Sequence, residues 1–186
     1  LATSDLRHGE RNIIVAPLFH IGGLGLAMSA VYRGMTTVLL KQFDPGVMWD
    51  LVDAEKITGF FAVPAMLALM YQHPKRTTTA RSALRWVICG AAPVPVTLIE
   101  AYLAMGVEVL QVYGLTETYG PAAVCARHPE WDALPLEEQV RRNGRQGVAY
   151  LLEEGMSVLD PHTLEPVPWD GETMGEIMFR GNITMK

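Results

Sequence analysis

The segment 113–118 brings together side chains that could bind a nucleotide and its phosphates. Tyr113 follows an apolar run that predicts a buried strand, and its flat ring could stack on a base. Gly114 would let the chain turn sharply beside that ring. The hydroxyl of Thr116 could contact a phosphate oxygen, and the carboxylate of Glu117 is the kind of hard ligand that Mg²⁺ takes alongside substrate phosphates. An aromatic ring, a glycine, a hydroxyl and an acid within five residues are consistent with a nucleotide-phosphate site.

The same residues also have a purely structural interpretation. Tyr113 could pack in the core at the end of a strand, and Thr116 could cap a helix. The residues of this segment alone leave both interpretations open. The choice between them depends on whether other segments suited to ligand binding would lie beside this one in the fold.

Three further segments combine small residues or a proline with the end of an apolar run. They are 16–23, 62–65 and 89–93. In an open parallel sheet, ligands bind outside the carboxyl ends of the strands, where the following turns offer backbone donors and acceptors. We therefore expect the fold to gather these segments and residues 113–118 on one rim, although they are far apart in the sequence.

Strand-like and helix-like patterns alternate between Asn12 and Cys125. Strands are predicted over 12–17, 36–40, 59–63, 84–89 and 107–112, and helices over 21–32, 65–71 and 96–105. Asp44 followed by Pro45 predicts the N-cap and the first position of another helix, and residues 75–81 form a polar loop. Continuous apolar strands that alternate with helices are typical of crossover connections, so the pattern predicts an α/β fold with a mostly parallel sheet.

The pattern changes after Cys125. A short surface helix is predicted over 135–142, followed by short apolar runs at 147–152, 156–160, 165–167 and 175–180. Asp-Pro and Asp-Gly turn signals separate these runs and favour antiparallel hairpins. We therefore expect two partial subdomains. Residues 1–126 form an α/β subdomain, and residues 127–186 form a surface excursion and the first strands of a β-rich, barrel-like subdomain.

The composition excludes several functional classes. Hydrophobic residues make up 49% of the chain, which is typical of a folded domain, and the net charge of −5 offers no basic face for nucleic acid. Cys89 and Cys125 are too few for a disulfide framework or a zinc site, and their apolar surroundings predict inert, buried thiols in a reducing cytoplasm. Residues 13–32 carry no acidic or basic side chain apart from His20, but Pro17 and three glycines favour a strand that turns into a buried helix over a transmembrane span.

Four motifs resemble, in the same order, those of the adenylate-forming superfamily, which includes acyl-CoA synthetases, luciferases and peptide-synthetase adenylation domains. Residues 113–118, Tyr-Gly-Leu-Thr-Glu-Thr, resemble its Tyr-Gly-x-Thr-Glu signature. Residues 17–22 and 90–93 resemble two upstream motifs, and residues 175–182 resemble the strand pair before the next motif. The resemblance extends over nearly the whole chain and implies an internal piece of the superfamily's N-terminal domain, with residues 1–126 binding nucleotide and acyl group.

The resemblance implies how a nucleotide, ATP or AMP, would be held. The ring of Tyr113 would stack on the adenine. The backbone of a short turn would line the edge of the purine, and this turn consists of Gly90, Ala91, Ala92 and Pro93.

The resemblance also implies the reacting groups. Thr116 and Glu117 would be catalytic, with Thr116 on the adenylate phosphate and Glu117 as the ligand of Mg²⁺. Gly114 would lie against both the nucleotide and the acyl group, and Leu115 would border the acyl pocket. His20 would lie near the carboxylate of the substrate, although a hydrogen-bonded core histidine is an alternative for this position.

The superfamily reaction has two steps. A carboxylate attacks the α-phosphorus of ATP, and the thiol of CoA then displaces AMP from the acyl-adenylate. Residues 19–21 offer no carboxylate for the ammonium of an amino acid, and residues 128–147 resemble an insert of bacterial and plant fatty acyl-CoA synthetases. We therefore expect a short- to medium-chain fatty acid as the substrate. An aryl-CoA ligase, a luciferase-like enzyme and a non-catalytic AMP-binding module are the alternatives.

Three parts of the family pattern are not found in this sequence. They are a phosphate loop rich in Gly, Ser and Thr before His20, a Thr-Gly-Asp segment that binds the ribose, and a lysine on a C-terminal domain. We therefore expect this chain to be a fragment that has no ligase activity by itself.

Overall fold

The computed structural model describes residues 6–151 and 153–185. The strands are β1 (Arg11–Ile14), β2 (Thr36–Leu39), β3 (Gly59–Ala62), β4 (Trp86–Cys89), β5 (Glu108–Leu115), β6 (Gly120–Val124), β7 (Val148–Ala149), β8 (Gly155–Leu159) and β9 (Glu176–Arg180). The α-helices are α1 (Ile21–Arg33), α2 (Pro45–Ala54), α3 (Pro64–Gln72), α4 (Lys75–Thr78), α5 (Val96–Ala104) and α6 (Leu136–Asn143), and the 3₁₀ helices are η1 (Thr116–Thr118) and η2 (Pro129–Ala133).

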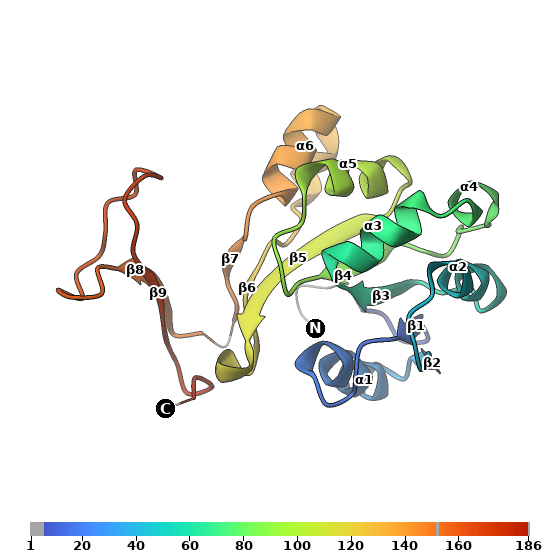
Figure 1. Ribbon diagram of the computed structural model, residues 1–186, viewed down its shortest axis with the longest axis horizontal. Helices are drawn as coiled ribbons and strands as arrows, with labels where there is room; N and C mark the ends of the chain where they lie inside the picture. Colours follow the sequence, from blue (N-terminus) through green and yellow to red (C-terminus); the bar gives the residue numbers. More distant parts are fainter. Residues whose placement is uncertain (1–5, 152, 186) are drawn as a thin grey trace.

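The main sheet contains seven strands in the order β2-β1-β3-β4-β5-β6-β7. Strands β1 to β5 run parallel to one another, whereas β6 pairs antiparallel with β5 and with β7. Strands β8 and β9 form a separate antiparallel hairpin that projects away from the main sheet (Figure 1). The prediction of an α/β fold with a mostly parallel sheet is therefore confirmed.

Helices cover both faces of the sheet (Figure 1). On one face, α2, α3 and α5 bury the larger core, which includes Trp49 and Tyr102. On the other face, α1 covers a smaller core that contains Ile14 and Trp86. Successive residues of a strand point to opposite faces, so Phe60 of β3 lies in the larger core and Phe61 packs against the smaller one. Both faces are apolar, which explains the continuous apolar runs in the sequence.

The helix boundaries follow local capping signals. The Asp44 carboxylate accepts the backbone N–H of Val47 at 2.8 Å, and Pro45 is the first residue of α2, as predicted. Helix α1 ends at Gly34, which has the left-handed φ of 61° that glycine adopts without steric cost. Among the described residues, no helix is long and apolar enough to cross a membrane. The run at 13–32 is divided between β1, a turn and α1, as the sequence predicts.

The elements between residues 12 and 125 differ from the sequence prediction in three main places. Residues 75–78 form the short helix α4 inside the predicted loop at 75–81. Strand β5 continues to Leu115, beyond the predicted end at 112, and β6 was not predicted. Strand β6 explains the longer β5, because the two pair with each other between residues 112 and 124.

The C-terminal third contains most of the predicted short elements. Helix α6 forms near the predicted range and packs beside α5, and β7 joins the main sheet through β6 (Figure 1). The predicted runs at 156–160 and 175–180 correspond to β8 and β9, and Pro166 forms a single bridge with Leu159. Residue Leu152 of the predicted run at 147–152 lies outside the described residues. The division of the chain after residue 126 stays a prediction.

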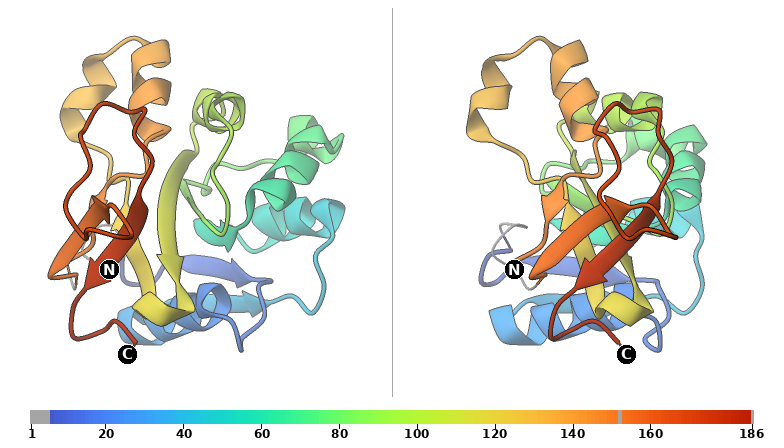
Figure 2. Two further views of the ribbon diagram at one scale, coloured as in Figure 1. Left: turned by 60° about the vertical axis from the view of Figure 1, so that its left-hand side comes forward. Right: turned by 90° about the vertical axis from the view of Figure 1, so that its left-hand side faces the viewer.

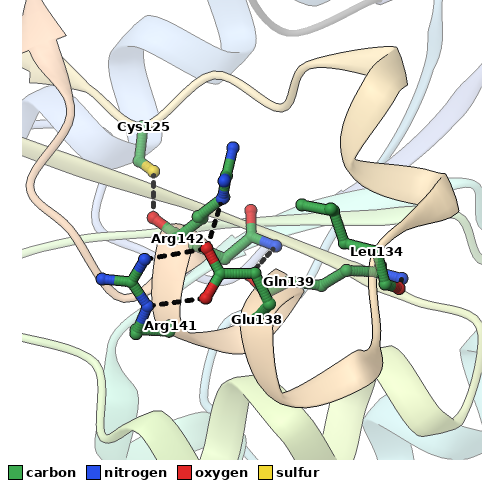
Figure 3. Close-up of polar contacts among 7 residues, drawn as sticks. Cys125, Leu134, Glu138, Gln139, Arg141 and Arg142 are labelled. Carbon is green, nitrogen blue, oxygen red and sulfur yellow. Dashed lines mark hydrogen bonds and ion pairs between the residues drawn. The ribbon is translucent and has the colours of Figure 1, made fainter.

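A polar network holds the surface excursion that contains α6 (Figure 3). The Glu138 carboxylate accepts hydrogen bonds from Arg141 Nε and Arg142 Nε, each at 2.7 Å. These hydrogen bonds lower the pKa of Glu138 from its ordinary value of 4.5 to about 2. The thiol of Cys125 donates to the carbonyl oxygen of Arg142 at 3.4 Å. The excursion is therefore tied to the end of β6.

Both cysteines are buried free thiols, as predicted. Burial raises the pKa of Cys89 to about 12, and burial is also the main cause of the raised pKa of Cys125. Because the thiolate is the reactive form of cysteine, both side chains are chemically inert at neutral pH.

Candidate functional site

A cavity of about 660 Å³ lies at the carboxyl end of the parallel strands, between the main sheet and the hairpin formed by β8 and β9. Its sheet wall includes six predicted site residues: Ala91, Ala92, Pro93, Tyr113, Gly114 and Leu115. Its opposite wall comes from β8, β9 and the loop between them. Figure 2 shows this hairpin beside β5 and β6. Cavities of this size are typical of sites for small molecules and cofactors.

The turn after β4 presents its backbone to the cavity. Gly90 is buried, and a Cβ atom there would lie 2.8 Å from Val112 Cγ2 of β5, so only glycine allows the two strands to approach this closely. Ala91 follows with a left-handed φ of 72°, which costs a non-glycine residue about 1–3 kcal/mol. Strained conformations of this kind concentrate at ligand sites. Residues 91–93 are exposed, and they line the cavity directly.

Tyr113 lies within β5 and not after it, so the predicted position at the end of a strand is wrong. Strand β6 pairs with residues 112–115 and extends β5 past the tyrosine. The ring is half-buried, lines the cavity and stacks on Phe179 of β9, with 6.2 Å between the ring centroids and 25° between the planes. The alternative of a core tyrosine does not hold.

Gly114 is required by the close approach of β5 and β6. A Cβ atom at this position would lie 1.9 Å from the carbonyl oxygen of Gly120. The strand register also shifts between Tyr113 and Gly114, which marks a β-bulge. Bulges redirect side chains and are frequent beside active sites. This glycine is therefore a structural requirement of the site, whatever the ligand.

The helix η1 directs two predicted catalytic side chains outward. Thr116 and Glu117 are exposed, and neither side chain forms a hydrogen bond or ion pair with any other described residue. The buried Thr118 holds the turn, since its hydroxyl accepts the N–H of Leu115 at 3.0 Å and lies 3.0 Å from the carbonyl oxygen of Gly120. The N-cap of η1 is Leu115, so the alternative in which Thr116 caps a helix is wrong.

The donor set at η1 suits a Mg²⁺ ion that also binds phosphates. The described residues contain no group of three or more His, Cys, Asp or Glu side chains that could hold a metal ion alone. Glu117 offers one exposed carboxylate that has no partner among residues 6–151 and 153–185. Mg²⁺ usually binds one or two carboxylates together with substrate phosphates and water. Glu117 therefore fits this mode and not a site built only from protein ligands.

His20 caps helix α1 at the surface. It is exposed, and its Nδ1 accepts the N–H of Gly22 at 3.2 Å, so the alternative of a core histidine is wrong. The side chain does not line the cavity. The start of α1 nevertheless lies beside the turn after η1, because a Cβ atom at Gly120 would lie 3.5 Å from Ile21 Cγ1.

Several cavity residues were not predicted from the sequence. Gln146 precedes β7, and residues 166–169 belong to the loop between β8 and β9. Of the predicted residues, Gly90 and Thr116 adjoin lining residues without lining the cavity themselves, and Glu117 is two residues from Leu115. The roles of all these residues stay predictions.

The fold and the cavity define an α/β domain with a cavity of small-molecule size at the carboxyl ends of its parallel strands. A family model described as AMP-binding enzyme matches residues 2–186. The chain belongs to this AMP-binding enzyme family.

Similar proteins agree with this family. The chain is 40% identical to the peroxisomal acetate/butyrate–CoA ligase of Arabidopsis thaliana, over 97% of this chain and 32% of that protein. It is also 40% identical to 4-hydroxybutyrate–CoA ligase 2 of Metallosphaera sedula, over 89% of this chain and 30% of that protein. The o-succinylbenzoate coenzyme A synthetase of Bacillus subtilis, solved with ATP and magnesium ion, matches with a TM-score of 0.77 and 27% identity, over 100% of this chain and 35% of that one.

The chain spans about a third of the length of these relatives. One of them is named as peroxisomal, so the cytoplasmic location of this protein stays a prediction.

Proposed function

We propose that the chain is the central nucleotide-binding part of an acyl-CoA synthetase that activates a short- to medium-chain fatty acid as acyl-AMP and transfers it to CoA. The observation that carries this proposal is the cavity of about 660 Å³, in which the turn at 91–93 and the strand end at 113–115 face one space. The names of the relatives support an aliphatic acid, since two of them are ligases for acetate or butyrate and for 4-hydroxybutyrate.

The adenine would bind between the turn and the strand end. In this proposal, the backbone of residues 90–93 lies along the edge of the purine, because residues 91–93 are exposed and line the cavity. Phe179 already stacks on one side of the Tyr113 ring, so the base would use the other side. A strained turn and a packed aromatic ring change little on binding, which keeps the entropic cost of binding low.

The phosphates would bind at η1. Thr116 would donate its hydroxyl to an oxygen of the α-phosphate, and Glu117 would hold Mg²⁺. When bound, the ion supplies positive charge that offsets the charge of the phosphates. Neither side chain must break a contact with another described residue to do so. Thr118 would keep the turn in place, so that the carboxylate of the acid meets the α-phosphorus in a fixed orientation.

The acyl group would lie beside the bulge in β6, opposite Tyr113 and Gly114 of β5. Leu115 is 42% exposed and lines the cavity, so it offers apolar surface to an aliphatic chain. Gly114 would border both the nucleotide and the acid. His20 would lie near the carboxylate, from the start of α1 beside the turn after η1.

The experiment measures acid-dependent ATP–pyrophosphate exchange in a longer protein that contains this chain and also the regions that its relatives have in addition. Butyrate or a longer aliphatic acid should support exchange, and AMP should be released only after CoA is added. Glu117→Gln should lower the exchange rate by about 10²-fold or more, because a ligand of the phosphate-bound metal is lost. Glu130→Gln is the matched control, since Glu130 is also exposed in a 3₁₀ helix, and it should leave the rate unchanged.

Other results would point to the alternatives. A large preference for benzoate-like acids would indicate an aryl-CoA ligase or a luciferase-like enzyme. A folded protein that binds AMP but exchanges pyrophosphate with no acid would indicate a non-catalytic AMP-binding module. The 186-residue chain alone should form no acyl-CoA, because the ribose-binding and lysine segments of the family pattern are not found in it.

A further inference from the structure

Gln111 is a buried polar side chain that connects three segments distant in the sequence. It lies in β5, two residues before Tyr113, and is 1% exposed. Its Oε1 accepts the backbone N–H of Val94 at 2.9 Å. Its Nε2 donates to the carbonyl oxygen of Arg145 at 2.9 Å and lies 3.5 Å from that of Gly144. A single side chain therefore joins β5, the turn after β4 and the segment after α6.

The hydrogen bonds determine the orientation of this amide. Val94 offers only a donor, whereas Arg145 and Gly144 offer only acceptors through their carbonyl groups. An amide oxygen can face only the first and an amide nitrogen only the other two. A flipped side chain would place two acceptors together at the carbonyl groups. A glutamine is thus the side chain of this length that satisfies all three backbone groups without a change in protonation.

Both ends of this connection lead directly to the cavity. Val94 is the residue after the turn at 91–93, whose three residues line the cavity. Arg145 is the residue before Gln146, which also lines it. Gln111 itself does not line the cavity. It can therefore affect a ligand only through the backbone positions of the two segments that it holds.

We propose that Gln111 is a positioning residue for the nucleotide, holding the turn at 91–93 and the segment at Gln146 at the separation that the base requires. This inference rests on the proposed function, which assigns the nucleotide to this cavity. A purely structural glutamine would stabilise the fold without a selective effect on nucleotide binding. The two roles predict different kinetic and binding changes.

The first test uses Gln111→Met, which has a similar shape but cannot bond to Val94 or Arg145. It is made in the protein that carries the remaining length of the relatives. The KM for ATP and the Kd for AMP, measured by calorimetry, should each rise about tenfold, as expected for the loss of a buried hydrogen-bonded pair. The KM for the fatty acid should stay within about twofold, since Leu115 and the acyl side of the cavity are not held by Gln111.

The matched control is Val109→Ala. Val109 lies two residues earlier in β5, on the same face, and packs in the larger core away from the cavity. Its truncation should lower the melting temperature but leave the KM for ATP and the Kd for AMP unchanged. Equal rises in both KM values for Gln111→Met, or a lower melting temperature without a change in the Kd for AMP, would overturn the proposal.

The second variant, Gln111→Glu, tests the role of the Gln111 Nε2 donor separately. It also serves as the test if the Gln111→Met protein does not fold. An ionised carboxylate still accepts the N–H of Val94 but repels the carbonyl of Arg145, whereas a protonated one donates to it. The ratio of the AMP Kd of this variant to that of the unchanged protein should therefore fall about threefold or more from pH 8 to pH 5.5, because burial favours the neutral acid.

Two thiols lie beside position 111, and the carboxylate of Glu108 is three residues away in β5. Cys89 is the neighbour of Gln111 on β4 and Cys125 its neighbour beyond β6, and burial raises the pKa of both thiols. A pH-independent ratio would overturn the role of the donor. If the unchanged protein binds no AMP, the proposed function itself fails. If it binds AMP and Gln111→Met binds equally well, only this inference fails.

Discussion

The two walls of the cavity belong to regions that are packed in very different ways. The sheet wall rests on a core in which Trp49, Phe60 and Tyr102 are fully buried. In the hairpin wall, none of the described residues from 153 to 185 is buried. Since burial of apolar surface supplies most of the stability of a domain, the first wall is held by its core and the second mainly by strand pairing.

A few contacts connect the hairpin with the sheet. Phe179 stacks on Tyr113, and the backbone N–H of Met185 donates to the carbonyl oxygen of Glu117 at 2.8 Å. Both contacts end at predicted site residues. Segments with few buried contacts open at low free energy, and ligand-binding elements are commonly drawn from them. The comparison indicates a preformed sheet wall, which carries the groups that we propose bind adenine, and a hairpin wall that can adjust to a ligand.

Replacing one tryptophan by alanine in each region should give the largest difference in the free energy of unfolding. Trp49 is fully buried and its Nε1 donates to the carbonyl oxygen of Met70 at 2.9 Å, so Trp49→Ala should lower the free energy of unfolding by about 3–5 kcal/mol. Trp169 is fully exposed in the hairpin region, so Trp169→Ala should change it by less than about 0.5 kcal/mol. Urea denaturation of both variants measures this. Similar losses in the free energy of unfolding would contradict the difference in packing between the two regions.

Replacing a glycine by alanine at the junction of the two regions should give a smaller difference in the free energy of unfolding. Gly114→Ala would place a Cβ atom 1.9 Å from the backbone of Gly120, so β5 and β6 must separate. The expected loss is about 1–3 kcal/mol, with weaker AMP binding. Gly155→Ala in β8 is the matched control, because the nearest atom would lie 3.7 Å away. Denaturation and AMP titration measure both effects. A stable Gly114→Ala protein with unchanged AMP affinity would contradict the close approach of the two strands.

The sequence predicts the sheet region well because its signals are local. Strands buried on both faces leave continuous apolar runs, and caps such as Asp44 before Pro45 mark where helices begin. Strand β6 was missed because Gly120 and Pro121 read as turn residues. The extension of β5 to Leu115 depends on pairing with β6, and no local pattern reveals such a pairing.

The candidate site divides in the same way. Motif resemblance predicted the turn at 91–93 and residues 113–115, and the structure places both at one cavity. Gln111 gave only a weak signal, since the predicted strand at 107–112 contains a second polar residue, Glu108. Its partners are 17 and 34 residues away, so its role requires the tertiary structure. The cavity residues of the hairpin are equally non-local, because their facing surface depends on where β8 and β9 pack.

The excursion with α6 is a third case: the buried residues Val140 and Asn143 pack it against the sheet region, and a polar network lies within α6. Changes in this network should show the smallest effect. Hydrogen bonds from Arg141 and Arg142 lower the pKa of Glu138 to about 2. Since the folded pKa is below the ordinary value of 4.5, this stabilisation is fully present above about pH 4.5 and is lost as the pH falls towards 2. Glu138→Gln should therefore lower the urea midpoint at pH 6 and not at pH 2.

The control for this prediction lies one residue earlier. Glu137 is exposed on α6, and no hydrogen bond or ion pair of its carboxylate is found within the described parts of the chain, so Glu137→Gln should leave the urea midpoint unchanged at both pH values. If the midpoints of Glu138→Gln and the unchanged protein differ equally at pH 6 and pH 2, the network of Figure 3 does not stabilise the excursion. The excursion would then be held by the burial of Val140 and Asn143 and by the packing of α6 on α5, which the hairpin lacks.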